Sequence, residues 1–241
     1  MIATTTSGAV ALVTIDRHER RNALDTEHCL ALQAAVTGAA AAARVVVITG
    51  AGSAFSAGAD LSDAYRSEFR DALRALLELL GDVPVPVIAA VNGPALGAGT
   101  QLAIAADLRI VAPAARFGVP AGRLGLALDH WTVRRLALLA GGATARLVLL
   151  AGEEVDAEAA LRRGLAERAG DLHEALLWAG GIAELAPLTL AAHKLALERA
   201  GGEEADHAEV VAAVRAAWES DDFAEGLAAF GERRPPRFEG R

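Results

Sequence analysis

The sequence predicts an α/β core followed by a helical C-terminal region. Two apolar, β-branched runs, residues 45–49 and 87–91, have the composition of buried parallel strands. Between them, residues 64–80 carry large apolar side chains at helical spacing, namely Phe69, Leu73, Leu76, Leu77 and Leu80. From Leu128 onward the pattern is almost wholly helical. Strands and helices that alternate and then give way to helices alone indicate one α/β core with a helical appendage.

Local signals place the elements along the chain. Residues 8–15 are expected to form an edge or hairpin strand, and a helix capped by Asp25 or Thr26 should extend to about residue 43. Strands are expected at 44–50, 87–91, 107–111 and 116–118, with a helix at 64–80 ended by Gly81 and a short helix from Ala98. The tail, residues 233–241, is too polar and proline-rich to be a helix.

Length and composition exclude several classes of protein. The 241 residues are enough for one large domain, or one domain with an appendage, around a sizeable core. No apolar stretch reaches the roughly 18 uncharged residues of a membrane span, and no basic region precedes a long apolar run at the N-terminus. Cys29 is the single cysteine, which excludes an internal disulfide framework. These features predict a cytoplasmic protein that does not insert into membranes.

The net charge of −8 argues against a general nucleic-acid-binding protein. Arginines nevertheless cluster near both ends, at positions 17, 20 and 21 and at positions 233, 234, 237 and 241. In an acidic protein such clusters are candidate sites for a phosphorylated ligand. The alternative interpretation is ordinary solvated surface charge.

Several sequence motifs of known chemistry are missing. The chain contains no phosphate-binding Gly-x-x-x-x-Gly-Lys-Ser/Thr, and Gly50-x-Gly52 lacks the third glycine of a dinucleotide fingerprint. Ser56 stands in Ala-x-Ser-x-Gly, one residue short of a nucleophile elbow. The six histidines show no paired metal-ligand spacing, so no metal site is predicted.

Two stretches rich in small residues, 54–61 (AFSAGADL) and 92–99 (NGPALGAG), follow the two predicted core strands. Small residues let the backbone approach a ligand closely, and a helix start leaves N–H donors unpaired at the positive end of the helix dipole. Two such turns side by side would form a cradle for negative charge developing on a carbonyl oxygen.

The segments AFSAGADL, AVNGPALGAGTQLAIAADLRI and ARFGVPAGRLGL, preceded by RNAL at 21–24, resemble the enoyl-CoA hydratase/isomerase (crotonase) superfamily. The match runs in order over nearly the whole chain. The resemblance implies a ClpP/crotonase spiral of ββα units at 1–185 and a helical trimerisation region with a basic tail at 186–241. It also implies trimers or dimers of trimers, and a fatty acyl-CoA or enoyl-CoA thioester as ligand with no further cofactor.

In this family the thioester carbonyl lies between two backbone N–H groups, which the resemblance assigns to Ala57 and Ala98. Hydratases of the family also use two glutamates, and their positions correspond to Gln101 and Ala121 here. A glutamine amide does not exchange a proton near neutral pH, and alanine has nothing to exchange. Because each acid–base group contributes roughly 10²–10⁴ in rate, the sequence predicts no ordinary hydratase activity.

Asp129 lies eight positions past Ala121, where some superfamily members carry a catalytic aspartate. A proton-transfer role is one interpretation, and an N-cap of the helix that follows is the other. The neighbouring Trp131 would dry the site or pack against an acyl chain, and His130 is expected beside the site or at the surface.

The resemblance assigns ligand contacts position by position. Coenzyme contacts are expected from Arg21, Ala23, Ser56, Ala57, Asp60, Leu61 and Gly97, and from a tail, Arg237 and Phe238, that could reach a neighbouring subunit's coenzyme. Tyr65 and Phe69 are expected to shape the acyl pocket, with His130 and Trp131. Asp60 has an alternative role as a turn cap and Phe69 as a core residue.

Three functions are consistent with these residues. The first is an acyl-CoA-binding protein without hydratase activity. The second is an enzyme of the same superfamily that isomerises, decarboxylates or cleaves its thioester through Asp129. The third is a purely structural partner in an oligomer, which would bind no acyl-CoA.

Overall fold

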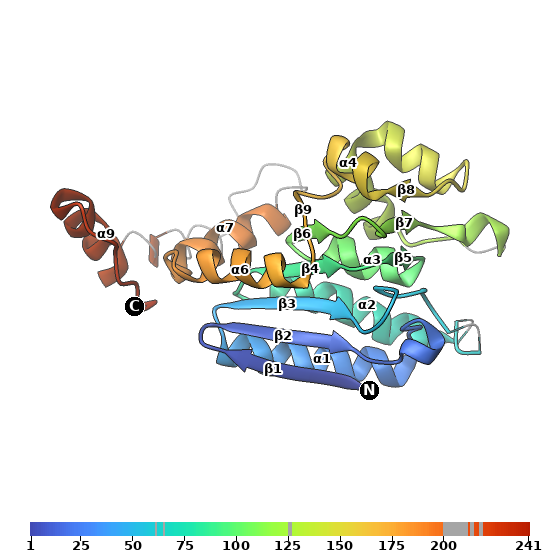
Figure 1. The fold of residues 1–241 in the computed structure, drawn as a ribbon, viewed down its shortest axis with the longest axis horizontal. Helices are drawn as coiled ribbons and strands as arrows, with labels where there is room; N and C mark the ends of the chain where they lie inside the picture. Colours follow the sequence, from blue (N-terminus) through green and yellow to red (C-terminus); the bar gives the residue numbers. More distant parts are fainter. Residues whose placement is uncertain (61, 65, 125–126, 200–211, 213–214, 217–218) are drawn as a thin grey trace.

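The computed structural model describes residues 1–60, 62–64, 66–124, 127–199, 212, 215–216 and 219–241 (Figure 1). Its main sheet has six strands in the order β1-β2-β3-β4-β6-β9. These strands are β1 (Ile2–Ser7), β2 (Val10–Ile15), β3 (Val45–Gly50), β4 (Val87–Val91), β6 (Leu108–Val111) and β9 (Arg168–Ala169). β1 and β2 form an antiparallel hairpin, and every later pair in the sheet is parallel.

The two central strands are apolar because they are covered on both faces. All residues of β3 and β4 are buried. Val46 and Ile48 face the cluster built with α1 (Thr26–Ala42) and α2 (Ser67–Asp82), whereas Val45 and Val47 face α6 (Leu172–Ala183). Alternation within an entirely apolar run is typical of a parallel strand between helix layers. The predicted α/β core is therefore confirmed.

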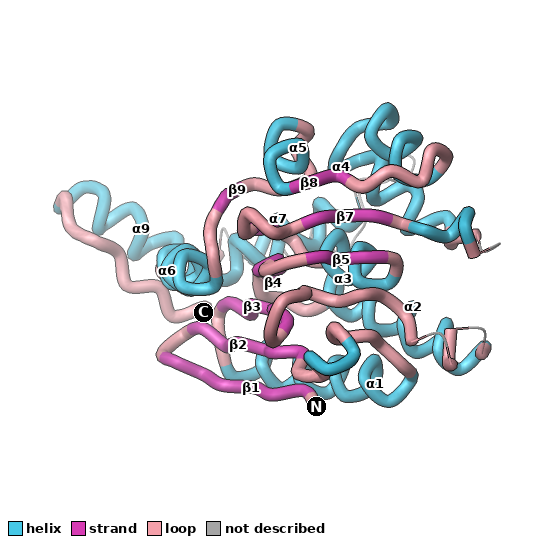
Figure 2. The backbone as a smooth tube through the Cα atoms, turned by 45° about the vertical axis from the view of Figure 1, so that its right-hand side comes forward, coloured by secondary structure: helices cyan, strands magenta, loops and turns pink. Residues whose placement is uncertain are grey.

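A second sheet continues the winding of the chain in the order β5-β7-β8 (Figure 2). Its strands are β5 (Pro94–Leu96), β7 (Arg116–Gly118) and β8 (Val155–Asp156). The remaining elements between Pro94 and Arg162 are α3 (Ala98–Ala105), η2 (Pro120–Arg123), α4 (His130–Leu149) and α5 (Ala157–Arg162). The second glycine-rich turn, residues 92–99, follows β4 of the main sheet and contains β5 of the second sheet, so it connects the two sheets.

Several elements differ from those predicted. The strand expected at 8–15 begins at Val10, because Gly8 lies in the hairpin turn with a φ of +58°. The edge strand is β1, which was not predicted because its threonines and serine lack an apolar alternation. The helix expected at 64–80 spans Ser67–Asp82, so Gly81 lies inside it rather than after it.

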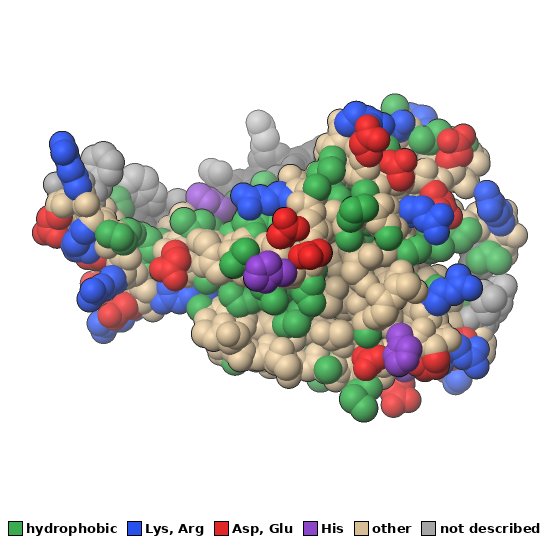
Figure 3. Space-filling model, in the orientation of Figure 1, with side chains coloured by type: hydrophobic (Ala, Val, Ile, Leu, Met, Phe, Trp, Pro, Cys, Tyr) green, Lys and Arg blue, Asp and Glu red, His purple; other side chains and the backbone are tan. Residues whose placement is uncertain are grey.

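The C-terminal region contains α7 (Pro187–Arg199) and α9 (Asp221–Glu232). The tail after α9 folds back on it, since Glu225 pairs with Arg234 and Asp222 accepts from the backbone of Glu239 and Gly240. Acidic and basic side chains crowd this part of the surface (Figure 3). A domain boundary at 185/186 stays a prediction.

Two buried cations hold the C-terminal half against the main sheet. Arg109 is fully buried and donates to Glu167 and to the carbonyl of Leu165. Lys194 donates to Asp107 at 2.8 Å and to the carbonyls of Leu80 and Val85. Burial lowers the pKa of the Lys194 amine. Charges this buried need partners, and both have them.

No single helix within the described residues has the length and hydropathy of a membrane span. α6 and α7 meet that test only when they are taken together across a bend of 109°.

Candidate functional site

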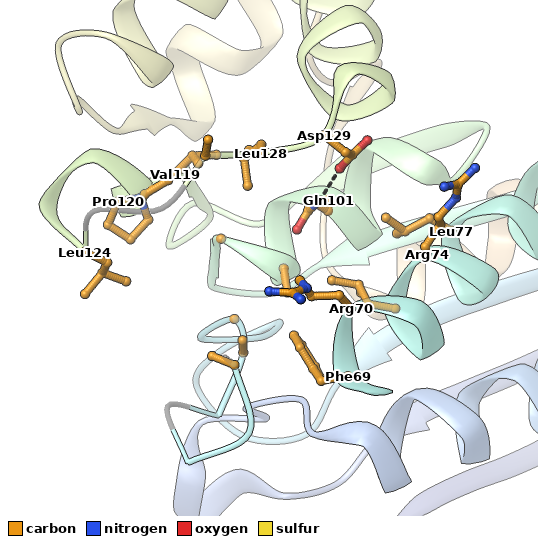
Figure 4. A pocket seen from close by; sticks show the side chains of 18 of the residues that line it. Phe69, Arg70, Arg74, Leu77, Gln101, Val119, Pro120, Leu124, Leu128 and Asp129 are labelled. Carbon is orange, nitrogen blue, oxygen red and sulfur yellow. Dashed lines mark hydrogen bonds between the residues drawn. The ribbon is translucent and has the colours of Figure 1, made fainter. Parts of the chain in front are cut away.

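A cavity of about 1350 Å³ lies beside the turns that follow β3 and β4 (Figure 4). α2 and η2 supply further walls, together with the segment that leads into α4. Much of the lining is apolar, including Phe69, Leu73, Leu77, Val119, Leu128 and Trp131. A cavity of this size, built at the ends of parallel strands, is a suitable place for a small-molecule ligand.

The two glycine-rich turns lie side by side, as the sequence predicts. The Leu96 N–H donates to the Ser56 carbonyl at 2.9 Å. Gly58 has a φ of +100°, and a Cβ atom there would lie 2.6 Å from the Leu96 carbonyl oxygen and 3.5 Å from the Ala98 nitrogen. Glycine is therefore required at 58 by its backbone conformation and by the close approach of the second turn.

The second turn ends in a helix start. Gly97 has a φ of +51° and precedes Ala98, the first residue of α3. Within the described residues the Ala98 N–H has no protein acceptor, as expected for the first amide of a helix. Its position in the cavity wall makes it a donor available to a ligand.

In the first turn the available donor is two residues later than predicted. The Ala57 N–H donates to the Arg21 carbonyl at 2.9 Å, so Ala57 is not a free donor for a ligand. The Asp60 N–H is likewise used, because it donates to the Leu24 carbonyl. Ala59 lies opposite Leu24 in an isolated parallel β-bridge, whose two hydrogen bonds are made by the neighbouring Gly58 carbonyl and Asp60 N–H. The Ala59 N–H itself has no acceptor among the described residues. Ala59 also lines the cavity, which makes it the partner of Ala98.

Gln101 and Ala121 both line the cavity, on α3 and η2 respectively. Gln101 is buried, and its amide nitrogen donates to Thr132 Oγ1 at 2.8 Å and to Asp129 Oδ2 at 3.3 Å. These contacts fix the orientation of the Gln101 side chain (Figure 4). Ala121 contributes a methyl group. Neither side chain can transfer a proton near neutral pH.

Asp129 is the N-cap of α4. Its Oδ1 accepts from the Thr132 N–H at 3.0 Å, and its Oδ2 accepts from Thr132 Oγ1 at 2.7 Å. Together with the bond from Gln101, these contacts engage both carboxylate oxygens. The geometry supports the capping interpretation, although the carboxylate still lines the cavity.

The residues predicted to hold the coenzyme are only partly brought together. Ala23, Ala57, Asp60 and Gly97 line the cavity, and so does Arg20, the neighbour of the predicted Arg21. Ser56 does not line it, because its side chain is fully buried and Oγ donates to the Asn22 carbonyl; its contact with the coenzyme stays a prediction. Leu61 lies outside the described residues.

Although Asp60 lines the cavity, its carboxylate is already engaged by protein groups. Its carboxylate accepts from Ser62 and pairs with Arg17 at 2.9 Å. These contacts, with the Ser62 hydrogen bond first, lower the pKa of Asp60. The turn-capping alternative is therefore supported.

Of the predicted acyl-pocket residues, Phe69, His130 and Trp131 line the cavity. Phe69 is also buried in the core, so both of its predicted roles fit. Tyr65 lies outside the described residues. Within those residues, no group of three or more His, Cys, Asp or Glu side chains could hold a metal ion.

Arg237 and Phe238 do not line the cavity of their own chain. The Arg237 N–H donates to Glu225, and the Phe238 carbonyl accepts from Arg44, which precedes β3. The turn at the cavity follows the opposite end of β3, after Gly50. A contact from this tail to a ligand would therefore have to be made in a neighbouring subunit.

Asn22 is a structural centre that sequence reasoning missed. Its side chain donates to the carbonyls of Ala51 and Ala54 and accepts from the Arg17 N–H. Its φ of +58° is unusual for a residue other than glycine. The available signal was the asparagine itself, since asparagine tolerates this conformation better than most residues.

Comparison with known proteins agrees with this architecture. The enoyl-CoA hydratase/isomerase family matches residues 5–241. The chain is 45% identical over 245 residues to "Probable enoyl-CoA hydratase echA6" of Mycobacterium tuberculosis, and 44% identical over 246 residues to the protein of the same name from Mycobacterium leprae, with 100% of both partners covered in each case. A solved structure of an enoyl-CoA hydratase/carnithine racemase from Magnetospirillum magneticum has a TM-score of 0.92 at 31% identity, covering 100% of this chain and 96% of that one. The crotonase-like fold is thus confirmed, and the chain belongs to the enoyl-CoA hydratase/isomerase family.

Proposed function

We propose that this protein binds acyl-CoA or enoyl-CoA thioesters and does not hydrate them at the rates usual for the family. The thioester oxygen would accept hydrogen bonds from the N–H groups of Ala59 and Ala98. The observation that carries this proposal is the pair of unused amides, in adjoining turns, on the wall of one cavity. Preorganised amides of this kind stabilise charge on a carbonyl oxygen.

The second part of the proposal rests on Gln101 and Ala121. Both line the same cavity, and both stand where the family resemblance places the glutamates of hydratases. Losing two acid–base groups, each contributing roughly 10²–10⁴ in rate, would leave hydration close to the background level.

The coenzyme would lie toward Arg20 and Ala23, which both line the cavity. A neighbouring subunit would add Arg237 and Phe238 in a trimer or a dimer of trimers. This arrangement requires no further cofactor, and a cytoplasmic location fits a coenzyme A ester as ligand.

Calorimetric titration with straight-chain acyl-CoA esters of graded length, beside a crotonyl-CoA hydration assay, tests both parts. We expect measurable binding and no hydration above background. Hydration at ordinary family rates would refute the second part, and failure of every ester to bind would refute the first.

Ala98→Pro removes one amide at a helix position that tolerates proline. Losing one neutral hydrogen bond should weaken thioester binding by about 1 kcal/mol, or roughly fivefold. Ala98→Ser keeps the N–H and is the matched control. Equal affinities for the two variants would refute the assigned role of this amide.

Because Asp129 also lines the cavity, a second candidate is an isomerase, decarboxylase or thioester-cleaving enzyme that uses this carboxylate. Asp129→Asn keeps a capping side chain and removes the charge. Turnover that survives this substitution, for every substrate found, would eliminate the second candidate.

A further inference from the structure

α2 directs a cationic side chain into a largely apolar cavity. Arg70 lines the cavity on the same helix as Phe69, Leu73 and Leu77. Figure 4 shows its guanidinium projecting from α2 into the cavity. Within the described residues, the Arg70 side chain makes no hydrogen bond or ion pair, so it is available to a ligand.

Three of the carboxylates in the cavity lining already have partners in the protein. Glu78 pairs at 2.8 Å with Arg74, which lies one helical turn after Arg70. Asp60 pairs with Arg17, and both oxygens of Asp129 accept hydrogen bonds from the protein. Asp71 also lines the cavity; the pKa of Arg74 is raised first by the hydrogen bond to Glu78 and to a smaller extent by the charge of Asp71.

An unpaired guanidinium in this position discriminates between ligands. While the cavity is open, water solvates Arg70. A bound hydrocarbon chain would displace part of that water and offer the guanidinium no partner, which is unfavourable. An anionic group would instead accept two parallel hydrogen bonds from the planar guanidinium.

We propose that Arg70 binds a carboxylate on the acyl chain, so that the preferred ligands are CoA esters of dicarboxylic or similarly acidic acyl groups. This inference rests on the proposed binding of acyl-CoA and adds the class of acyl group. The acyl chain, rather than the coenzyme phosphates, is the source of the anion because Arg70 shares its helix face with the apolar wall formed by Leu73 and Leu77.

Titration with hexanoyl-CoA, adipoyl-CoA and free coenzyme A tests the proposal. The two esters have the same chain length and differ in a terminal methyl or carboxylate group. Wild-type protein should bind adipoyl-CoA about tenfold more tightly than hexanoyl-CoA, at the lower end of the effect of a charge-assisted hydrogen bond.

Arg70→Gln should abolish this preference, and Arg70→Lys should keep part of it because the charge remains without the planar fork. Arg74→Gln is the matched control. It removes a cation from the same helix and the same cavity wall, but Glu78 already neutralises that cation. This variant should retain the preference.

Equal wild-type affinity for the two esters would overturn the inference while leaving acyl-CoA binding intact. Arg70→Gln would also overturn the inference if it weakened the binding of free coenzyme A and of adipoyl-CoA by the same factor, because the guanidinium would then bind a phosphate of the coenzyme. If Arg70→Gln and Arg74→Gln reduced the preference for adipoyl-CoA equally, the preference would come from the overall positive potential of the cavity and not from an ion pair between Arg70 and the acyl carboxylate. Binding of none of the three compounds would overturn the proposed function as well.

Discussion

Replacing Gln101 by glutamate tests how the cavity wall is coupled to the start of α4. In the native chain the Gln101 amide nitrogen donates to Asp129 Oδ2 at 3.3 Å. Gln101→Glu would turn that donor into a second carboxylate oxygen at a similar separation. We expect the substitution to destabilise the fold at pH 7, because two like charges would then face each other.

The separation sets the size of this effect. Two unit charges 3.3 Å apart repel by about 1 kcal/mol at the dielectric constant of water and by about 5 kcal/mol at the lower value typical near a protein surface. Proton uptake limits the upper end, since protonating an ordinary glutamate at pH 7 costs about 3.7 kcal/mol. The expected loss in the free energy of unfolding is therefore about 1–4 kcal/mol at pH 7.

The sign of the pH dependence follows from the same limit. The introduced carboxyl has a raised pKa in the folded protein, so its penalty is present at high pH and disappears as the pH falls. At pH 5 proton uptake limits the penalty to about 1 kcal/mol.

Urea unfolding of four proteins at pH 7 and pH 5 measures this effect. The four are the wild type, Gln101→Glu, Asp129→Asn and the double variant. Asparagine still caps a helix, so the double variant should recover most of the stability lost at pH 7. Strictly additive single effects, or an equal penalty at both pH values, would refute the reasoning.

Three further outcomes are expected. Gly58→Ala should abolish thioester binding in calorimetry, because the added Cβ would lie 2.6 Å from the Leu96 carbonyl oxygen. Binding retained by a variant that circular dichroism shows to be folded would contradict this geometry. Lys194→Ala should lower the unfolding free energy by about 3–5 kcal/mol by leaving Asp107 without its cation; a loss no larger than that of the exposed control Arg162→Gln would contradict it. The stability difference between wild type and Asp60→Asn should be complete above about pH 5 and shrink as the pH falls through the lowered pKa of Asp60; a difference that stays constant down to acid pH in urea titrations would be the contrary result.

The parts of the fold that depend on local pattern could be predicted from the sequence. The predicted bounds of β4 agree with the structure, because a wholly apolar run with Pro86 before it and Asn92-Gly93 after it has few alternatives. The start of α3 at Ala98 was also correct, since the turn composition and the helical run meet there. The polar β1 was missed because only its pairing with β2 makes it a strand.

The finer geometry of the site depends on contacts between distant segments. Ala57 and Ala59 belong to the same turn, and the bond from the Ala57 N–H to the Arg21 carbonyl decides which amide remains unused. No local pattern reports that bond. The position of Arg70 is a similar case. The apolar stripe predicts α2, but only the packing of α2 determines that Arg70 borders the cavity.

Asn22 connects two segments that both contribute to the proposed ligand site. The segment around Asn22 carries Arg20 and Ala23, which line the cavity, and the Asn22 side chain donates hydrogen bonds to the loop that leads to Ala59. A substitution at Asn22 would therefore disturb both parts of the proposed site together, although Asn22 does not line the cavity. Sequence variation at this buried asparagine is consequently a better indicator of lost ligand affinity than variation at the exposed arginines around it.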